Sequence, residues 1–358
     1  MDDMQRLKED YPWIQTPLVV GAPMRLIALA DMAVEVSKAG GIGFIGAGTD
    51  VSDLESHIQH AKTLLNDTPA ALPTKNRTLP IGIGFINWGA DLETAIPIIA
   101  QHRPAAVWFF APSSTASLVQ WAEASRTASP STKIWVQIGS VKDAVEVVQQ
   151  ISPDVLVVQG TDAGGHGLVQ GASIITLLPE VSDAIDALHH RTQRTKPILL
   201  AAGGISESRT FTASLTLGAS GCVLGTRLLA TPEAAISSGY RSAILRTTDG
   251  GQSTVRTKVY DSLRGTNWAG THNARGIITQ SYVDAVEKGM SQEENTRLYR
   301  EEMRKGDEGW REGGGRMTAY AGSGVGLVRE VKGAGEVVRE VREGVVGVLE
   351  RVGRRARL

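Results

Sequence analysis

Short, continuously apolar runs recur along this chain as far as residue 224, and segments with a helical pattern separate them. The runs do not alternate with polar residues, which is typical of strands buried on both faces of a parallel sheet. Their number constrains the fold most, because a doubly wound sheet usually stops at about five or six strands. The eight runs cover residues 18–20, 42–45, 81–85, 106–110, 134–138, 155–158, 198–201 and 222–224.

Helical patterns between the runs complete a regular β/α alternation. Ser140, Ser173 and Ser206 stand where helix N-caps are expected. Eight β/α units match the usual size of a barrel of this kind, so we predict an α/β fold, a TIM (β/α)8 barrel. The clearest helical segments are 30–39, 53–65, 141–150 and 206–217.

The pattern changes after Ala230. Residues 240–315 are polar with little strand signal, a helix is expected at 281–305, and an amphipathic helix is expected at 325–352. The predicted parts are a barrel over 1–240, a smaller, mostly helical substrate domain or lid over 241–315, and a C-terminal segment over 316–358 that packs back on the barrel.

Charge and composition exclude several partners. The chain has 37 basic and 38 acidic residues, so it offers no field that attracts nucleic acid. No apolar run approaches the roughly 20 residues of a membrane helix. A single cysteine and an N-terminus without a signal-peptide pattern favour a reducing compartment, the cytoplasm. The C-terminal Ala-Arg-Leu resembles a peroxisomal address, which is the alternative localisation.

Glycines gather where the last three strands are expected to end, which is the active-site face of a barrel. The last two of these loops often form a phosphate site, where backbone N–H groups approach the anion. A phosphorylated ligand such as FMN, or a sugar phosphate, is the leading interpretation, and plain tight turns are the alternative. The residues concerned are Gln159, Gly160, Gly164, Gly165, Gly203, Gly204, Gly225 and Thr226.

His166 lies within the first of these loops and is the candidate catalytic base. An imidazole that titrates near neutral pH can accept a proton from a carbon acid. An ordinary solvated loop histidine is the alternative. No dense cluster of metal-ligand residues is evident, so no metal site is predicted. The other histidines are interpreted as solvated: His57, His60, His102, His189, His190 and His272.

Residues 157–167, VVQGTDAGGHG, resemble the signature loop of the nitronate monooxygenase (2-nitropropane dioxygenase) family. The resemblance extends over nearly the whole chain and implies a TIM barrel with noncovalently bound FMN. Other similar segments are TPLVVGAPM (16–24), AAGGI (201–205), GCVLGTR (221–227) and YAGSGVG (320–326). The resemblance and the loops together assign cofactor binding to Ala22, Pro23, Met24, Gln137, Gln159, Gly160, Gly164, Gly165, Gly203, Gly204, Gly225 and Thr226.

Three positions depart from the family pattern. Gln137 stands where some relatives place a lysine near the flavin, Gly84 where many have Asn, and Ser323 where many have Gln. A neutral amide at position 137 would stabilise an anionic flavin less than a lysine would. The departures at Gly84 and Ser323 bear on substrate range more than on flavin binding.

The resemblance implies oxidation of an alkyl nitronate by dioxygen, giving a carbonyl compound and nitrite. His166 would act as a base if neutral nitroalkanes are also used, or would orient the nitro group. An NAD(P)H-dependent flavin reductase acting on a quinone or enoyl thioester is the alternative, and a barrel that only binds a phosphorylated metabolite is a third reading. The expected partners are the small-molecule substrate and dioxygen, and exposed apolar helix faces leave a homodimer open.

Overall fold

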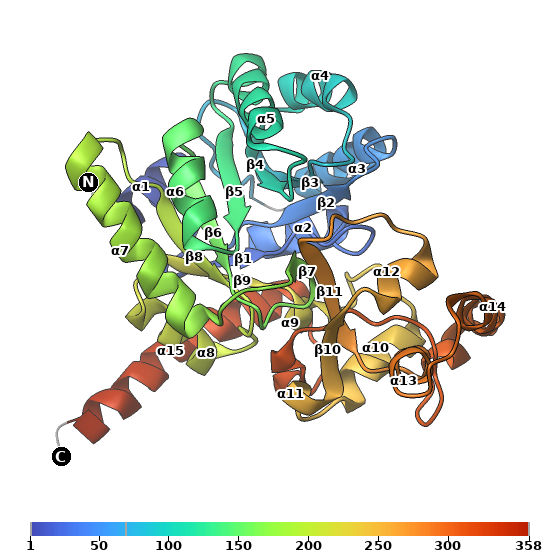
Figure 1. Cartoon of the computed structure of the whole chain (residues 1–358). Coiled ribbons are helices and arrows are strands. Elements are labelled where there is room, and N and C mark those ends of the chain that lie inside the picture. Colours follow the sequence, from blue (N-terminus) through green and yellow to red (C-terminus); the bar gives the residue numbers. More distant parts are fainter. Residues whose placement is uncertain (1, 69, 357–358) are drawn as a thin grey trace.

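Eight parallel strands form the main sheet of the computed structural model, which describes residues 2–68 and 70–356 (Figure 1). Each apolar run of the sequence corresponds to one strand, which confirms all eight. The strands are β1 (Leu18–Gly21), β2 (Phe44–Gly48), β3 (Leu79–Ile86), β4 (Pro104–Phe110), β5 (Lys133–Ile138), β6 (Val155–Gln159), β8 (Ile198–Ala202) and β9 (Gly221–Leu224).

The sheet closes on itself. Its hydrogen-bonded order runs β1-β9-β8-β6-β5-β4-β3-β2, so β1 and β2 are its two ends. A parallel bridge joins Val20 to Ile42 just before β2. The Gly21 amide donates to the Ile42 carbonyl at 3.0 Å, and the Ile42 amide donates to the Val19 carbonyl at 3.3 Å. This closure confirms the predicted TIM barrel.

Large aromatic side chains fill the inside of the barrel. The rings of Phe44 and Trp135 lie 5.0 Å apart, and those of Trp108 and Trp135 lie 5.9 Å apart. Gly82 on β3 makes room for Phe44, because a Cβ atom there would lie 2.2 Å from the Phe44 ring. The Trp135 indole N–H donates to the Tyr11 hydroxyl at 2.7 Å, just after α1 (Asp3–Asp10). Strand residues pointing outward pack on the helices, so both faces are apolar.

Helices surround the barrel, and the last of the ring comes from the far end of the chain. The C-terminal helix α15 packs against α8, α2 and β1. Its Arg342 side chain donates to the Ala39 carbonyl at 2.9 Å. The ring consists of α2 (Ala30–Lys38), α3 (Leu54–Asn66), α4 (Leu92–His102), α5 (Thr115–Ala128), α6 (Val141–Gln150), α7 (Ile174–Thr192), α8 (Ser208–Thr216) and α15 (Ala334–Ala356).

Two expectations about helix starts need correction. The helix expected at 325–352 begins only at Ala334, where Glu233 accepts the first backbone N–H, and a 3-10 turn, η2 (Ser323–Leu327), precedes it. Ser206 is not the cap of α8, because Glu207 forms a capping box there with Thr210. Ser140 caps α6 as predicted. Ser173 occupies the N-cap position of α7 without a side-chain bond to the helix.

A second group of elements lies beside the strand ends (Figure 1). It contains a three-stranded antiparallel sheet in the order β10-β11-β7, and two of these strands lie in the region where the sequence has little strand signal. The helix expected at 281–305 is divided into two. The boundaries proposed at 240 and 315 stay predictions. The elements are β7 (Gly165–Leu168), α9 (Thr226–Leu229), α10 (Ser238–Arg246), α11 (Gly250–Ser253), β10 (Thr254–Thr257), α12 (Val259–Arg264), β11 (His272–Ile277), α13 (Gln280–Val286), α14 (Gln292–Met303) and η1 (Gly306–Trp310).

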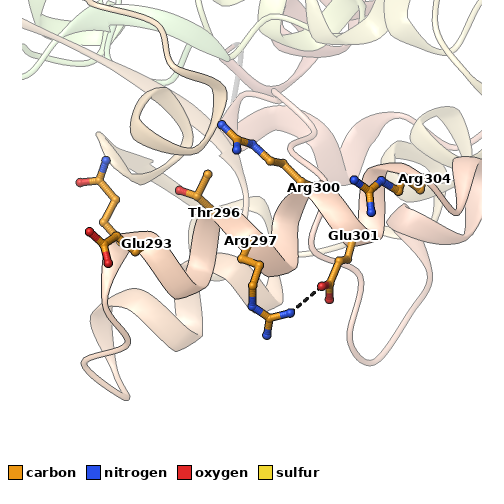
Figure 2. A pocket seen from close by; sticks show the side chains of 7 residues that line it. Glu293, Thr296, Arg297, Arg300, Glu301 and Arg304 are labelled. Carbon is orange, nitrogen blue, oxygen red and sulfur yellow. Dashed lines mark hydrogen bonds and ion pairs between the residues drawn. The ribbon is translucent and has the colours of Figure 1, made fainter.

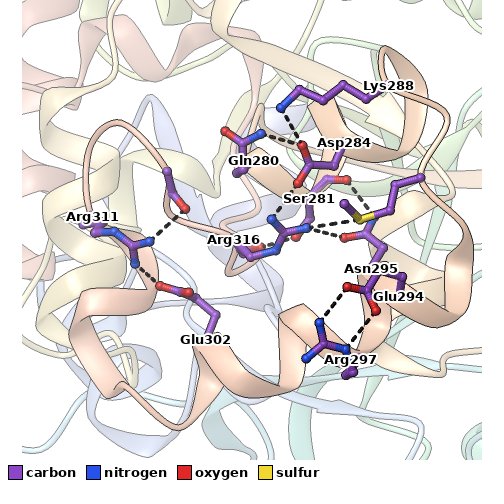
Figure 3. A network of polar contacts seen from close by, with 12 residues as sticks. Gln280, Ser281, Asp284, Lys288, Glu294, Asn295, Arg297, Glu302, Arg311 and Arg316 are labelled. Atoms are coloured by element: carbon purple, nitrogen blue, oxygen red, sulfur yellow. Dashed lines mark hydrogen bonds and ion pairs between the residues drawn. The ribbon is translucent and has the colours of Figure 1, made fainter.

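A buried polar network joins α13 and α14 to the chain that follows them (Figure 3). Arg316 donates to Asp284 Oδ2 at 2.6 Å and to Asn295 Oδ1 at 2.8 Å. Burial would raise the pKa of Asp284, but hydrogen bonds from Lys288, Arg316 and Gln280 outweigh burial and lower that pKa to about 2. The network therefore fixes the segment that leads to Tyr320. Within the described part of the chain, no helix is both long and apolar enough to cross a membrane.

The contribution of α15 to barrel stability can be measured with one buried and one exposed valine. Val338 is fully buried and Val346 is 61% exposed. Val338→Ala should lower the free energy of unfolding by about 2 kcal/mol, because an apolar side chain is lost from the core. Val346→Ala should change it by less than about 0.5 kcal/mol. Urea denaturation of both variants measures the difference, and equal effects would contradict the packing of α15 on the barrel.

Candidate active site

A cavity of about 850 Å³ lies at the C-terminal ends of the barrel strands, and α12 and α14 contribute to its outer wall. The structure places His166 and all but one of the predicted cofactor-binding residues around it. These residues are Ala22, Pro23, Met24, Gln137, Gln159, Gly164, Gly165, Gly203, Gly204, Gly225 and Thr226. Whether they bind a cofactor stays a prediction.

Gly160 is the predicted cofactor-binding residue that does not line the cavity. Its amide donates to the Ala202 carbonyl at 2.9 Å, which joins the end of β6 to β8. A Cβ atom on Gly160 would lie 2.5 Å from the Ile174 nitrogen. The structure therefore gives Gly160 a packing role behind the wall, against the start of α7.

A second hollow, of about 740 Å³, runs along the outer face of α14 (Figure 2). Its residues come from that helix and from Arg304 just after it, and Arg297 forms an ion pair there with Glu301. Exposed ion pairs of this kind contribute little stability. None of the predicted site residues belongs to its described lining, so the candidate active site is the cavity at the strand ends.

His166 lies on β7, opposite Ala274 of β11. Its Nε2 atom is 2.8 Å from Asp261 Oδ1, and the His166 side chain is 13% exposed. The imidazole stacks on Trp268, with ring centroids 3.7 Å apart and planes 10° from parallel. Burial lowers the pKa of His166 because it disfavours the charged ring, while Asp261 acts in the opposite direction. Burial therefore favours the neutral ring, which is the form that can accept a proton.

Arginine side chains give the cavity a positive character. Arg25, Arg264 and Arg300 line it, and no Asp or Glu occurs among the described residues of its wall. The Arg264 guanidinium lies over the Tyr320 ring, 5.3 Å from the ring centroid. Such a cavity favours an anionic ligand over a cationic one.

Gln137 presents hydrogen-bond donors to the cavity. The Trp108 indole N–H donates to Gln137 Oε1 at 3.0 Å. An indole N–H can only donate, so this contact assigns the amide oxygen to the Trp108 side and leaves the NH₂ group for the cavity. A donor is thus present where some relatives place a lysine, but without the positive charge.

Arginines of the small sheet hold the glycine-rich loop that leads to His166. Arg256 of β10 donates to the carbonyls of Thr161, Ala163 and Gly165 at 2.9 to 3.3 Å. Burial and the nearby Arg275 lower the pKa of Arg256 to about 10. On the other side of the loop, the Ser323 hydroxyl donates to Asp162 Oδ1 at 2.8 Å. The loop therefore depends on contacts from outside the barrel.

Two of the histidines interpreted as solvated are not. His102 is buried between Glu55 and Lys62, at 2.7 and 2.6 Å. His272 lies near His166 and Trp268, and burial lowers its pKa to about 4, with a smaller effect from His166. Over the described ranges, no three His, Cys, Asp or Glu side chains cluster as metal ligands would.

Sequence reasoning missed four side chains at this site. Asp261 and Arg264 lie in the polar region after residue 240, where no individual site residue was predicted, and Trp268 and Tyr320 belong to no local pattern. All four contact His166 or one another only after folding. Tyr320 lies in a segment that the family resemblance includes, which was the one available signal.

A ligand cavity at this end of a (β/α)8 barrel, with a largely buried histidine in its wall, is typical of a barrel enzyme. Comparison with known proteins identifies the class of enzyme more closely. The family profile of nitronate monooxygenase matches residues 7–344. The chain therefore belongs to the nitronate monooxygenase family and is an oxidoreductase.

Individual relatives agree with this assignment. The nitronate monooxygenase npaC of Metarhizium robertsii is 42% identical, over 97% of this chain and 96% of that protein. A nitronate monooxygenase of Neurospora crassa is 34% identical, over 95% of this chain and 92% of the relative. A solved nitroalkane oxidase from Streptomyces ansochromogenes has a TM-score of 0.71 at 19% identity, covering 96% and 99% of the two chains, which shows the shared fold.

The departure at Gly84 has a steric reason that a variant can test. A Cβ atom there would lie 2.2 Å from the Pro23 Cβ, so Gly84→Ala must displace Pro23 from the cavity wall. We expect a loss of about 1–3 kcal/mol in the free energy of unfolding. Gly270→Ala is the matched control, because no atom lies within 4 Å of a Cβ at that position. Equal stability of the two variants in urea would contradict this packing.

Proposed function

We propose that the protein uses FMN to oxidise alkyl nitronates with dioxygen, giving a carbonyl compound and nitrite. The observation that carries the proposal is the single cavity around which the barrel gathers His166, Gln137 and the glycine-rich strand ends. Membership of the nitronate monooxygenase family supports it.

The residues around the cavity fit FMN. Gly203 and Gly204 have φ angles of +98° and +74°, which allows the backbone after β8 to turn beside the cavity without a side chain. Gly225 follows β9 at the neighbouring position. Backbone N–H groups of these two loops would hold the phosphate. Gly165 has open space where a Cβ would be, which leaves room for a ring system.

Side chains around the remaining space would bind and orient the substrate. Bound FMN would supply the electron acceptor for nitronate oxidation and pass electrons to dioxygen. Arg264 and Arg300 would attract the nitronate anion, and the Gln137 amide would donate to the flavin. His166 is needed when the substrate is a neutral nitroalkane, whose α-proton must leave first.

Oxygen consumption and nitrite formation test the proposal directly. Purified protein loaded with FMN should consume dioxygen and release nitrite when ethyl nitronate is added. Protein stripped of FMN should lose this activity and regain it when FMN is restored, because the flavin is the electron acceptor. A protein that binds no FMN, or an FMN-loaded protein that forms no nitrite from any nitronate, would contradict the proposal.

The role of His166 is separable from flavin binding. His166→Asn should reduce nitroalkane turnover by about 10²–10⁴-fold, because it removes the base. Nitronate turnover and FMN content should largely persist, since the nitronate has already lost its proton. Steady-state rates with nitroethane and ethyl nitronate measure the difference. Equal loss of both activities with FMN retained would argue against His166 as the base.

The compartment and the oligomeric state also remain proposals. We propose a cytoplasmic location, and the peroxisomal alternative depends on an Ala-Arg-Leu end whose last two residues, 357 and 358, lie outside the described residues. A fluorescent reporter carrying these last residues should give a diffuse signal. A homodimer stays a prediction, which light scattering of the purified protein tests.

A further inference from the structure

The buried carboxylate of Asp261 faces one nitrogen of His166. Asp261 Oδ1 lies 2.8 Å from His166 Nε2, and the Asp261 side chain is 3% exposed. The Thr266 hydroxyl donates to the same oxygen at 3.1 Å, which holds the carboxylate in place. A carboxylate oxygen accepts hydrogen bonds, so the neutral imidazole must carry its proton on Nε2.

The other ring nitrogen is the one left to react. Within the described chain, no protein group forms a hydrogen bond with His166 Nδ1, and His166 lines the cavity. Stacking on Trp268 fixes the plane of the imidazole ring, and the hydrogen bond to Asp261 fixes the direction in which Nε2 points. These two contacts together oppose rotation of the imidazole, so Nδ1 keeps one orientation.

We propose that Asp261 is a positioning residue that holds His166 with its proton on Nε2, so that Nδ1 is the atom that takes the α-proton of a neutral nitroalkane. This inference rests on the proposed function. In the step itself the C–H bond breaks, the N–H bond forms on Nδ1, and the electron pair stays on the substrate as the nitronate. No electron leaves the substrate in this step, and Asp261 stabilises the imidazolium that results.

The charges around His166 give Asp261 a second effect. Burial lowers the pKa of His166, Asp261 raises it, and the positive charges of Lys258 and Arg264 lower it further. Asp261 therefore offsets part of the effect of burial and makes the imidazole a better proton acceptor, while burial favours its neutral form. The groups that face the ring are Asp261 and Arg264 of α12, Lys258 at the N-cap of that helix, His272 of β11, and Tyr320.

Nitrogen NMR of the wild-type protein tests the tautomer without any change at Asp261. FMN-loaded protein with ¹⁵N-labelled histidine should show neutral His166 with protonated Nε2 and unprotonated Nδ1. The signals are assigned by their loss in His166→Gln. A proton on Nδ1 would overturn the proposal. This measurement does not depend on turnover, so it separates failure of the inference from failure of the proposed function.

Asp261→Asn tests the electrostatic effect. The substitution keeps an acceptor but removes the charge, so the kcat/KM for nitroethane should fall by about 10- to 100-fold. Loss of the negative charge should lower the pKa of His166. The acid limb of the pH profile of kcat/KM for nitroethane should therefore move to lower pH. The kcat/KM for ethyl nitronate should fall by less than that for nitroethane, because oxidation of the nitronate needs no proton transfer to His166. An unmoved acid limb, or equal loss with both substrates, would overturn the proposal.

Asp284→Asn is the matched control, because Asp284 is a carboxylate buried in the same group of helices that binds Arg316 and not His166. Asp284→Asn should lower stability without changing the charge beside His166. The acid limb of its pH profile of kcat/KM for nitroethane should therefore stay at the wild-type position. If Asp284→Asn shifts the limb as Asp261→Asn does, the effect is structural and the proposal is wrong. FMN content and thermal unfolding of both variants are measured alongside.

Discussion

The pairing of β7 with β11 is the contact on which the site depends. β7 begins in the glycine-rich loop at the end of a barrel strand, and β11 belongs to the small sheet outside the barrel. The pairing therefore attaches His166 to both the barrel and the small antiparallel sheet. Without it, the imidazole would be an ordinary loop side chain, as one reading of the sequence allowed. With it, the ring lies between Asp261 and Trp268.

Burial and the charge of Asp261 act in opposite directions on the pKa of His166, and their balance suits a general base. Desolvation disfavours the imidazolium, so the ring is ready to accept a proton at neutral pH. Asp261 prevents burial from making the ring a poor acceptor. Arginines in the cavity wall favour an anion, which a neutral nitroalkane becomes only when it has lost its α-proton. The barrel forms the rigid inner wall of the cavity. The small sheet and its helices contribute most of the charged side chains around it.

The barrel could be predicted from sequence because its strands are buried on both faces, which leaves a continuous apolar run for each. The small sheet could not, because β10 reads Thr-Val-Arg-Thr and β11 contains His272, Asn273 and Arg275. Arg256 and Arg275 donate to carbonyls of the glycine-rich loop, and Arg275 also donates to the Thr254 hydroxyl. These strand positions are therefore polar, and no apolar alternation marks the strands. The cap of α8 was misplaced by one residue, since Glu207 replaces the expected serine through a capping box.

The candidate site, like the fold, could be predicted from the sequence only in part. Its cavity-lining glycines could be predicted because they follow strand ends in the sequence. Asp261 could not, because it lies far along the chain from His166 and meets it only through the β7 and β11 pairing. Gly160 shows the limit of loop-based reasoning: it belongs to the same loop, yet it packs against α7 behind the wall. Contacts between distant segments leave no local pattern in a single sequence.

The central claim is that the nitronate itself supplies the electrons. An anaerobic absorbance titration of the FMN-loaded protein tests it most directly, with ethyl nitronate added to one cuvette and NADPH or NADH to another. The account predicts that the nitronate removes the oxidised-flavin absorbance and that neither pyridine nucleotide does so rapidly. Rapid loss with NADPH or NADH and none with the nitronate would contradict it, and would identify a flavin reductase instead.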